Sequence, residues 1–243
     1  MTEALIQEVR KIMEKSPSIA FFGGAGVSTA SGIPDFRSAT GLYNQKSETS
    51  YSPEYMLSHD FLIDHPGDFS DYVRNNLIND EAKPNGAHRA LKTLEDRGQL
   101  TAVITQNIDG LHQLAGSSKV LEIHGNLTDY YCRACGKPAD RKAFLETTGA
   151  FHCDCGGVIR PDVVLYGEGL DERVWKEAAE SIAKSQTLIV GGTSLMVYPA
   201  ASLLSYYRGK ELILINQEAT GADRHADYVL QGDISKILPA LVD

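Results

Sequence analysis

Short apolar runs alternate with longer amphipathic stretches along most of this chain. The apolar runs, typical of buried strands, lie near residues 18–22, 101–105, 120–123, 187–191, 211–215 and 227–230. Apolar residues recur at helical spacing near residues 3–15, 86–97, 171–183 and 198–207. Regular alternation of strands and helices is typical of a parallel sheet that helices cover on both faces. We therefore predict an α/β fold with a doubly wound parallel sheet.

Two stretches interrupt this alternation. Residues 38–80 contain Tyr, Phe, Asp and Pro without a clean strand pattern, which indicates a loop followed by short helices. Residues 128–158 contain all four cysteines of the chain. We expect both stretches to stand apart from the sheet.

The cysteines are Cys132, Cys135, Cys153 and Cys155, in the pattern C-x2-C-x17-C-x-C. Two short cysteine hooks can place four thiolates around one zinc ion. Four thiolates leave zinc no open position for water, so such a site is structural. His152 could replace one thiolate, although a solvated loop histidine is the simpler interpretation. Disulfide bonds or free thiols would also fit this spacing.

A glycine-rich segment follows the first apolar run, with Gly24 and Gly26 before small residues that can open a helix. Glycines let the backbone approach a ligand closely, and N–H groups at a helix start favour a phosphate. The match to G-x-G-x-x-G is incomplete because Thr29 occupies the third position, and no P-loop lysine follows. The segment predicts either a dinucleotide site or a tight structural turn.

Polar side chains follow two further apolar runs. Gln106, Asn107 and Asp109 come directly after residues 102–104, and His124 comes directly after residues 120–123. Ligands of open α/β sheets bind at the carboxyl ends of the strands. An amide pair, a carboxylate and an imidazole at one edge therefore indicate a reaction centre, although each residue alone could be a loop cap.

Several blocks of the sequence together resemble the signature motifs of the sirtuins, which are NAD-consuming protein lysine deacylases. The resemblance spans roughly residues 5–238, and within that family the chain is similar to the bacterial deacetylases. The blocks are Gly24–Ser28, Gly32–Arg37, Thr105–His112, His124–Gly125, Arg160–Glu168, Gly192–Leu195, Val197–Ala200 and Ile215–Asn216.

The resemblance implies a single catalytic domain over residues 1–243, in two parts. A large Rossmann-like part would comprise residues 1–37, 81–127 and 159–243. A small part would combine two insertions, residues 38–80 with a loop and helices and residues 128–158 with a zinc ribbon. NAD and the peptide would lie in the cleft between the two parts.

The resemblance also implies the residues that contact NAD. Asp109 would accept the carboxamide N–H of nicotinamide, Asn107 would hold a ribose or a water, and residues 23–26 would hold the pyrophosphate. The full set is Gly24, Ala25, Gly26, Thr29, Asp35, Phe36, Arg37, Gln106, Asn107, Ile108, Asp109, His124, Gly192, Thr193, Ser194, Asn216, Asp233 and Ile234.

In the implied reaction, the acyl oxygen of a modified lysine attacks the ribose carbon as nicotinamide leaves. His124 acts as general base through the ribose hydroxyls, with Asn107 as the second catalytic residue. A histidine suits this role because its pKa lies close to working pH. The products are free lysine, nicotinamide and an O-acyl-ADP-ribose, so NAD is consumed. Two alternatives remain: a mono-ADP-ribosyltransferase on the same scaffold, and a zinc-containing NAD sensor without catalysis.

The peptide is expected to add a strand beside Val163, Val164, Leu165, Tyr166 and Gly167. Tyr166 departs from the family, which usually has Phe there. Sirtuins that prefer succinyl or malonyl groups carry a Tyr-x-x-Arg pair. Ser70 and Val73 occupy the matching positions, whereas Tyr72 and Arg74 are out of register. The resemblance therefore implies an apolar tunnel for acetyl or longer fatty acyl groups.

Composition narrows the partners further. The net charge of −9 argues against sequence-independent nucleic-acid binding. It suits lysine-rich peptides, although solubility alone explains it equally well. No apolar run approaches the length of a membrane span, and the first residues lack the pattern of a signal peptide. We therefore expect a cytoplasmic protein. We assign no catalytic role to His112 and expect His88 to be a structural or helix-capping residue.

Overall fold

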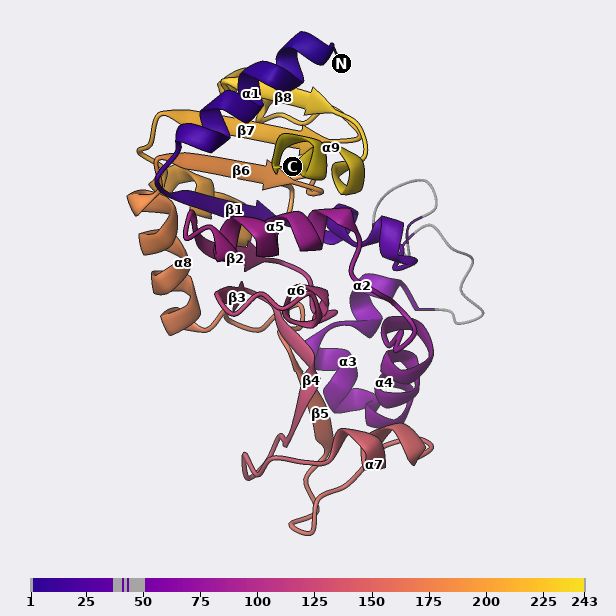
Figure 1. Ribbon diagram of the computed structural model, residues 1–243. Coiled ribbons are helices and arrows are strands. Elements are labelled where there is room, and N and C mark those ends of the chain that lie inside the picture. Colours follow the sequence, from indigo (N-terminus) through magenta and orange to yellow (C-terminus); the bar gives the residue numbers. More distant parts are fainter. Residues whose placement is uncertain (1, 37–40, 42, 44–50, 243) are drawn as a thin grey trace.

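A six-stranded parallel sheet organises the larger part of the molecule (Figure 1). The computed structural model describes residues 2–36, 41, 43 and 51–242. The strand order is β3-β2-β1-β6-β7-β8, and all neighbouring strands in this sheet are parallel. The strands are β1 (Ile19–Gly23), β2 (Leu100–Thr105), β3 (Val120–Glu122), β6 (Thr187–Gly191), β7 (Glu211–Asn216) and β8 (Tyr228–Gln231). All six strand predictions are confirmed.

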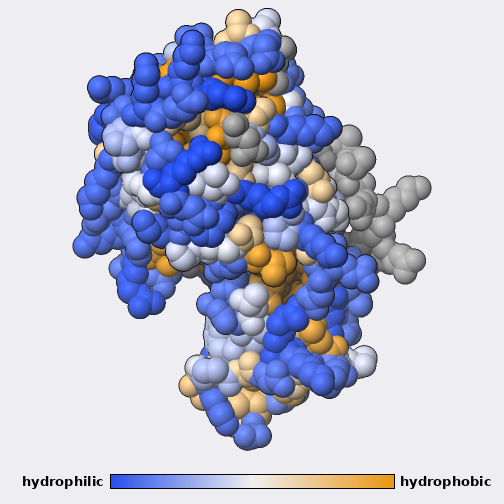
Figure 2. Space-filling model, viewed as in Figure 1, coloured by the Kyte–Doolittle hydropathy of each residue, from blue (hydrophilic) through white to orange (hydrophobic). Residues whose placement is uncertain are grey.

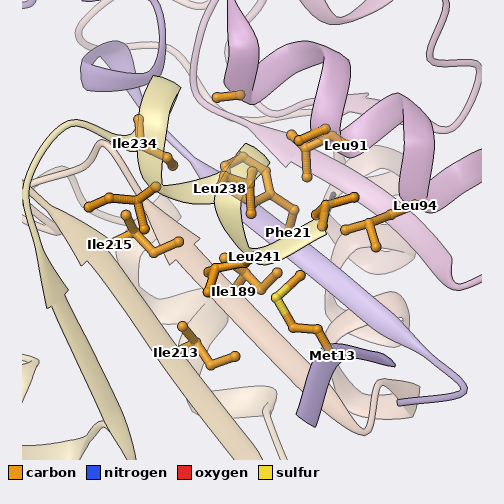
Figure 3. Packing of buried hydrophobic residues seen from close by; sticks show 14 of the residues in the cluster. Met13, Phe21, Leu91, Leu94, Ile189, Ile213, Ile215, Ile234, Leu238 and Leu241 are labelled. Atoms are coloured by element: carbon orange, nitrogen blue, oxygen red, sulfur yellow. The ribbon is translucent and has the colours of Figure 1, made fainter. Parts of the chain in front are cut away.

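Side chains of successive strand residues serve two separate cores, as the doubly covered sheet requires. Phe21 of β1 joins one cluster beneath α1 (Glu3–Lys15), α5 (Gly86–Asp96) and α9 (Ile234–Val242) (Figure 3). Phe22, the next residue, joins the other cluster under α8 (Glu172–Lys184) and η5 (Ala200–Tyr206). Every residue of β1 is buried, which explains its continuous apolar sequence.

The helix predictions are confirmed for α1, α5 and α8, and each begins after a capping side chain. The caps are Thr2, Asn85 and Asp171. The stretch predicted near residues 198–207 is a 3-10 helix, η5. Helix α9 is not among the predicted elements, because Pro239 lies inside it and interrupts the usual helical signal.

The second part of the molecule is built on an antiparallel strand pair, β4 (Gly125–Cys132) and β5 (Ile159–Val163). This pair runs from the sheet toward α7 (Arg141–Glu146), with α3 (His59–Asp64) and α4 (Pro66–Tyr72) beside it (Figure 1). Short helix α2 (Pro53–Met56) precedes them, and a π-turn (Val73–Leu77) follows α4. The strands β4 and β5 are absent from the predicted elements because polar residues interrupt the apolar pattern of a strand.

The two interrupting stretches share one apolar core, although they are distant in the sequence. Phe61, Phe69 and Val73 pack in one cluster with Tyr130 and Phe144. This common core explains why the two insertions lie together. The residue boundaries of the two parts stay a prediction.

Candidate functional site

The strand order reverses between β1 and β6, and this is where ligands bind in doubly wound sheets. The turn after β1 packs directly on the end of β6, because Gly26 N donates to Gly192 O at 2.8 Å. A Cβ atom at Gly26 would lie 2.8 Å from Gly192 Cα, so only glycine fits. Two 3-10 turns, η1 (Ala25–Val27) and η2 (Thr29–Ser31), follow in place of the helix start that the sequence favours.

Three polar side chains form a hydrogen-bonded chain beside this turn. Asn107 Nδ2 donates to Ser28 Oγ at 3.0 Å, and Ser28 Oγ donates to Asp109 Oδ2 at 2.6 Å. Leu111 N donates to Asp109 Oδ1 at 2.9 Å and fixes the carboxylate. Ser28 and Asn107 are both buried. Ser28 is not among the predicted site residues; its place directly after the glycine-rich turn is the signal that could have identified it.

His124 lies at the junction between the sheet and the strand pair. Its Nδ1 atom is 3.0 Å from Gln106 O, and its own carbonyl accepts from Val164 N at 2.9 Å. A carbonyl can only accept, so Nδ1 carries the proton and Nε2 holds a free lone pair. Burial lowers the pKa of His124, and the bond to Gln106 partly opposes that effect. The imidazole is therefore neutral near pH 7, as a general base must be.

Gly125 explains why the chain can turn directly after His124. Its φ is +71°, and a Cβ atom there would lie 1.8 Å from Asp162 O. Any side chain would force β4 away from β5 and move His124 with it.

Hydrogen bonds continue across the carboxyl ends of β2, β6 and β7. Gln106 Nε2 donates to Thr193 Oγ1 at 3.2 Å, and Thr193 N donates to Asn216 Oδ1 at 3.0 Å. Asn216 Nδ2 is buried and has no hydrogen-bond partner among the described residues. A buried donor of this kind is available to a polar ligand. Thr193 and Asn216, both in the predicted NAD set, therefore meet at one edge.

The remaining predicted NAD residues lie near this edge in different roles. Thr29 Oγ1 donates to Gly26 O, and the Phe36 ring packs on Tyr43 at 5.4 Å between centroids. Asp233 Oδ1 accepts from Ser235 N at the start of α9. Ile234 is buried in the core, so its side chain serves packing. Gly24 lies beside Thr193, and Ala25 belongs to η1. Ile108 packs against the core that the two insertions share, and Ser194 is exposed. Asp35 directly precedes Phe36, and Arg37 lies outside the described residues.

The predicted peptide-binding segment is firmly held by the rest of the chain. The N–H groups of Val164, Leu165 and Tyr166 donate to His124 O, Glu168 Oε2 and Leu57 O. Val163 is already paired with Gly125 in the strand ladder. Tyr166 and Gly167 are the exposed members, and the Tyr166 hydroxyl lies 2.8 Å from that of Tyr43. The role of this segment in peptide binding stays a prediction.

Two buried residues occupy the positions at which succinyl-preferring sirtuins carry the Tyr-x-x-Arg pair. These positions hold Ser70 and Val73, and Ser70 Oγ donates to Pro66 O at 2.8 Å. Arg74 is turned toward the cysteine-bearing insertion. Its guanidinium donates to Phe144 O, Gly149 O and Asp71 Oδ1, and its side chain is only 9% exposed.

The four cysteines meet at the far end of the strand pair, with their sulfurs all within 4.8 Å of one another. Cys132 Sγ lies 3.5 Å from Cys155 Sγ, and Cys135 Sγ lies 3.9 Å from Cys153 Sγ. Tetrahedral zinc–thiolate bonds of about 2.3 Å place the sulfurs about 3.8 Å apart, so the set fits zinc. All four are free, which rules out the disulfide interpretation.

Among the described residues, His152 is not part of the group whose ligand atoms lie together, and its Nδ1 atom lies 3.3 Å from Gly156 O. Gly157 supports the geometry, since a Cβ atom there would lie 2.6 Å from Cys132 Sγ.

His88 completes a capping box at the start of α5, which confirms its predicted capping role. Asn85 N donates to His88 Nδ1 at 3.2 Å, and Ala87 N donates to Asn85 Oδ1. The rings of His88 and His112 lie 4.7 Å apart. Burial lowers their pKa values to about 4 and about 3, so both are neutral near pH 7.

Polar residues dominate one face of the molecule (Figure 2). On the face drawn in Figure 2, hydrophilic residues cover most of the larger part, and hydrophobic residues show where the two parts meet. In the portion of the chain that the structure describes, no helix has the length and apolar character needed to cross a membrane.

Comparison with known proteins decides the family. A model of the Sir2 family matches residues 24–199, which is most of the chain. The chain belongs to the Sir2 family. An NAD-dependent protein deacetylase of Clostridium acetobutylicum is 52% identical over 239 residues, with 98% of each chain covered. A protein of the same description from Staphylococcus aureus is 44% identical over 238 residues, with the same coverage.

Solved structures extend this likeness to three dimensions. One described as the basis for the mechanism and regulation of Sir2 enzymes has a TM-score of 0.89 and 37% identity, covering 99% of this chain and 97% of its own. A Sir2 protein with a p53 peptide and NAD+ has a TM-score of 0.85 and 37% identity, covering 96% and 95%. The predicted fold class, with its Rossmann-like sheet and cysteine cluster, is confirmed.

Proposed function

We infer that this Sir2-family protein is an NAD-dependent protein lysine deacetylase. One observation carries the inference: His124, with its Nε2 lone pair free, lies at the same sheet edge as the Asn107–Ser28–Asp109 chain. Relatives of the same description match along nearly the whole chain. NAD supplies the ribose carbon that receives the acyl oxygen, and the chain supplies binding, orientation and proton transfer.

In this proposal each residue acts through a stated atom. His124 Nε2 takes a proton from a ribose hydroxyl, because Nδ1 is committed to Gln106 O. Asp109 accepts the carboxamide N–H of nicotinamide, since an ionised carboxylate has lone pairs beyond those used by Ser28 and Leu111. Asn107 holds a ribose hydroxyl or a water. The acyl group leaves lysine and ends on ADP-ribose, so the protein is an acyltransferase.

Substrate binding is proposed at residues 163–167, of which Tyr166 and Gly167 are exposed. The net charge of −9 is compatible with a substrate peptide rich in lysine. Cys132, Cys135, Cys153 and Cys155 would hold one zinc ion that stabilises the small core and leaves no position open for water. Four cysteines kept as thiolates suit a reducing compartment, and we propose that the protein acts in the cytoplasm.

The experiment is incubation with NAD and an acetyl-lysine peptide, with both products followed by mass spectrometry. Deacetylation should accompany nicotinamide release in equal amounts. Release of nicotinamide with ADP-ribose attached to protein, and no loss of acetyl, would instead identify a mono-ADP-ribosyltransferase. Tight NAD binding without either product would identify a sensor.

A further inference from the structure

The turn of residues 163–168 is held by a cluster of charged side chains that stands apart from the glycine-rich turn. Arg160 is almost completely buried, with its side chain 3% exposed. Its guanidinium donates to both oxygens of Glu168 and to Val163 O, and its Nε donates to Pro161 O at 3.2 Å. Two parallel bonds of this kind fix the relative orientation of arginine and carboxylate.

Glu168 completes the turn from the other side. Its Oε2 atom accepts from Leu165 N at 2.9 Å, and Glu168 N donates to Leu165 O at 3.0 Å. Burial alone would raise the pKa of Glu168, but the bonds from Arg160, His59 and Leu165 lower it to about 2. The carboxylate is therefore ionised near neutral pH and keeps its bonds to Arg160 and Leu165 N.

His59 connects this cluster to the helical insertion. Its Nδ1 atom lies 3.0 Å from Glu168 Oε1, and its backbone N–H donates to Tyr166 O at 2.9 Å. Tyr166 N in turn donates to Leu57 O. The exposed residues of the turn, Tyr166 and Gly167, thus lie between two anchored neighbours, Leu165 and Glu168.

We propose that Arg160, Glu168 and His59, here named the Arg160 brace, are positioning residues for the acyl-lysine peptide. The brace holds the exposed residues Tyr166 and Gly167 in the conformation that the peptide meets, so that binding does not have to order them. This proposal rests on the proposed function, because it takes residues 163–167 as the peptide site. The hydrogen bonds of the brace all end on residues outside the predicted NAD set. We therefore expect loss of the brace to weaken peptide binding more than NAD binding.

The test compares Glu168→Gln with the wild-type protein at saturating NAD. Glutamine keeps the shape but cannot accept two charge-assisted bonds from Arg160. We expect the peptide KM to rise about 10-fold, equivalent to about 1.4 kcal/mol, with kcat and the KM for NAD within about 2-fold. An unchanged peptide KM, or a loss confined to kcat, would overturn the proposal.

A second variant covers the case in which Glu168→Gln does not fold. His59→Ala removes one bond from a side chain that is 40% exposed and leaves the Arg160–Glu168 pair intact. It should raise the peptide KM about 2- to 3-fold, as expected for one lost hydrogen bond. A folded His59→Ala protein with the wild-type peptide KM would also count against the brace.

Arg141→Met is the matched control. Arg141 also joins an ion pair, with Asp80, and donates to a backbone carbonyl, Leu127 O, but it lies in the cysteine-bearing insertion. It should lower the melting temperature and leave the peptide KM unchanged. An equal rise in KM in this control would show that stability, not the brace, sets peptide affinity. If the wild-type protein itself does not deacetylate, the proposed function fails, and that outcome is distinct from failure of the brace.

Discussion

The position of Arg74 leads us to predict the acyl preference of this Sir2-family protein. A succinyl group carries a negative charge that needs a cation at the end of the acyl tunnel. Ser70 and Val73 supply none, and Arg74 is the cation that a shift of one residue in register would bring there. Its guanidinium holds three bonds, to Phe144 O, Gly149 O and Asp71, and lies 4.8 Å from the Phe144 ring.

The magnitude follows from those bonds. Hydrogen bonds to charged groups contribute about 1.5–3 kcal/mol each, so releasing Arg74 would cost roughly 5–9 kcal/mol. Pairing Arg74 with a succinyl carboxylate in the tunnel could not offset both costs, the release of Arg74 and the burial of the carboxylate. We therefore expect kcat/KM for a succinyl-lysine peptide to be at least about 10-fold below that for the acetyl-lysine peptide, which equals about 1.4 kcal/mol.

The assay measures kcat/KM for both peptides with wild-type protein and with Arg74→Met. The variant should be less stable, yet the ratio of the two rates should not change. Equal rates on both peptides would refute the assignment of the tunnel. If Arg74→Met selectively lowered the succinyl rate, Arg74 would have to reach the acyl group, contrary to its position in the structure.

Three further predictions address separate parts of the site. Metal analysis should find one zinc per chain, and Cys135→Ser should lower both zinc content and melting temperature because the metal contributes to folding. A wild-type protein without zinc, or a Cys135→Ser variant with the wild-type melting temperature, would contradict this. Ser28→Ala should leave Asn107 and Asp109 without their shared partner, at a cost of about 1–3 kcal/mol, and raise the KM for NAD while the peptide KM stays constant; wild-type NAD kinetics would remove Ser28 from the site. Because burial lowers the pKa of His124, its base form persists to lower pH. The acid limb of kcat/KM should therefore fall at an apparent pKa below 6.5, and a midpoint above 7 would argue against His124 as the base.

Much of the sheet could be predicted because its signals are local. The central strands are apolar runs buried on both faces, as in residues 187–191, and the polar residues that follow a strand mark its carboxyl end. This is why Asn107, Asp109 and His124 could be recognised before their contacts were known. The cysteines also give a local signal, since two short hooks favour a metal site, but only the structure shows that all four sulfurs meet.

The parts that could not be predicted depend on contacts between distant residues. Strand β4 contains Asn126, Thr128 and Asp129, and only its pairing with residues 159–163 makes it a strand. Ser28 belongs to the site because residues 107 and 109 reach it across the sheet edge. Glu168 bonds to both Arg160 and His59, and His59 lies outside the motif block that contains the other two.

The central claim is that His124 is the general base of an NAD-dependent deacetylation. The most direct test is a mass-spectrometric rate for an acetyl-lysine peptide with wild-type protein, His124→Ala and the control His225→Ala, which changes an exposed histidine in η6 (Asp223–His225). Removing a general base typically lowers the rate about 10²- to 10⁴-fold. We predict a loss in that range for His124→Ala with an unchanged fold and zinc content, and a wild-type rate for His225→Ala. A folded His124→Ala protein that deacetylates at the wild-type rate would contradict the account.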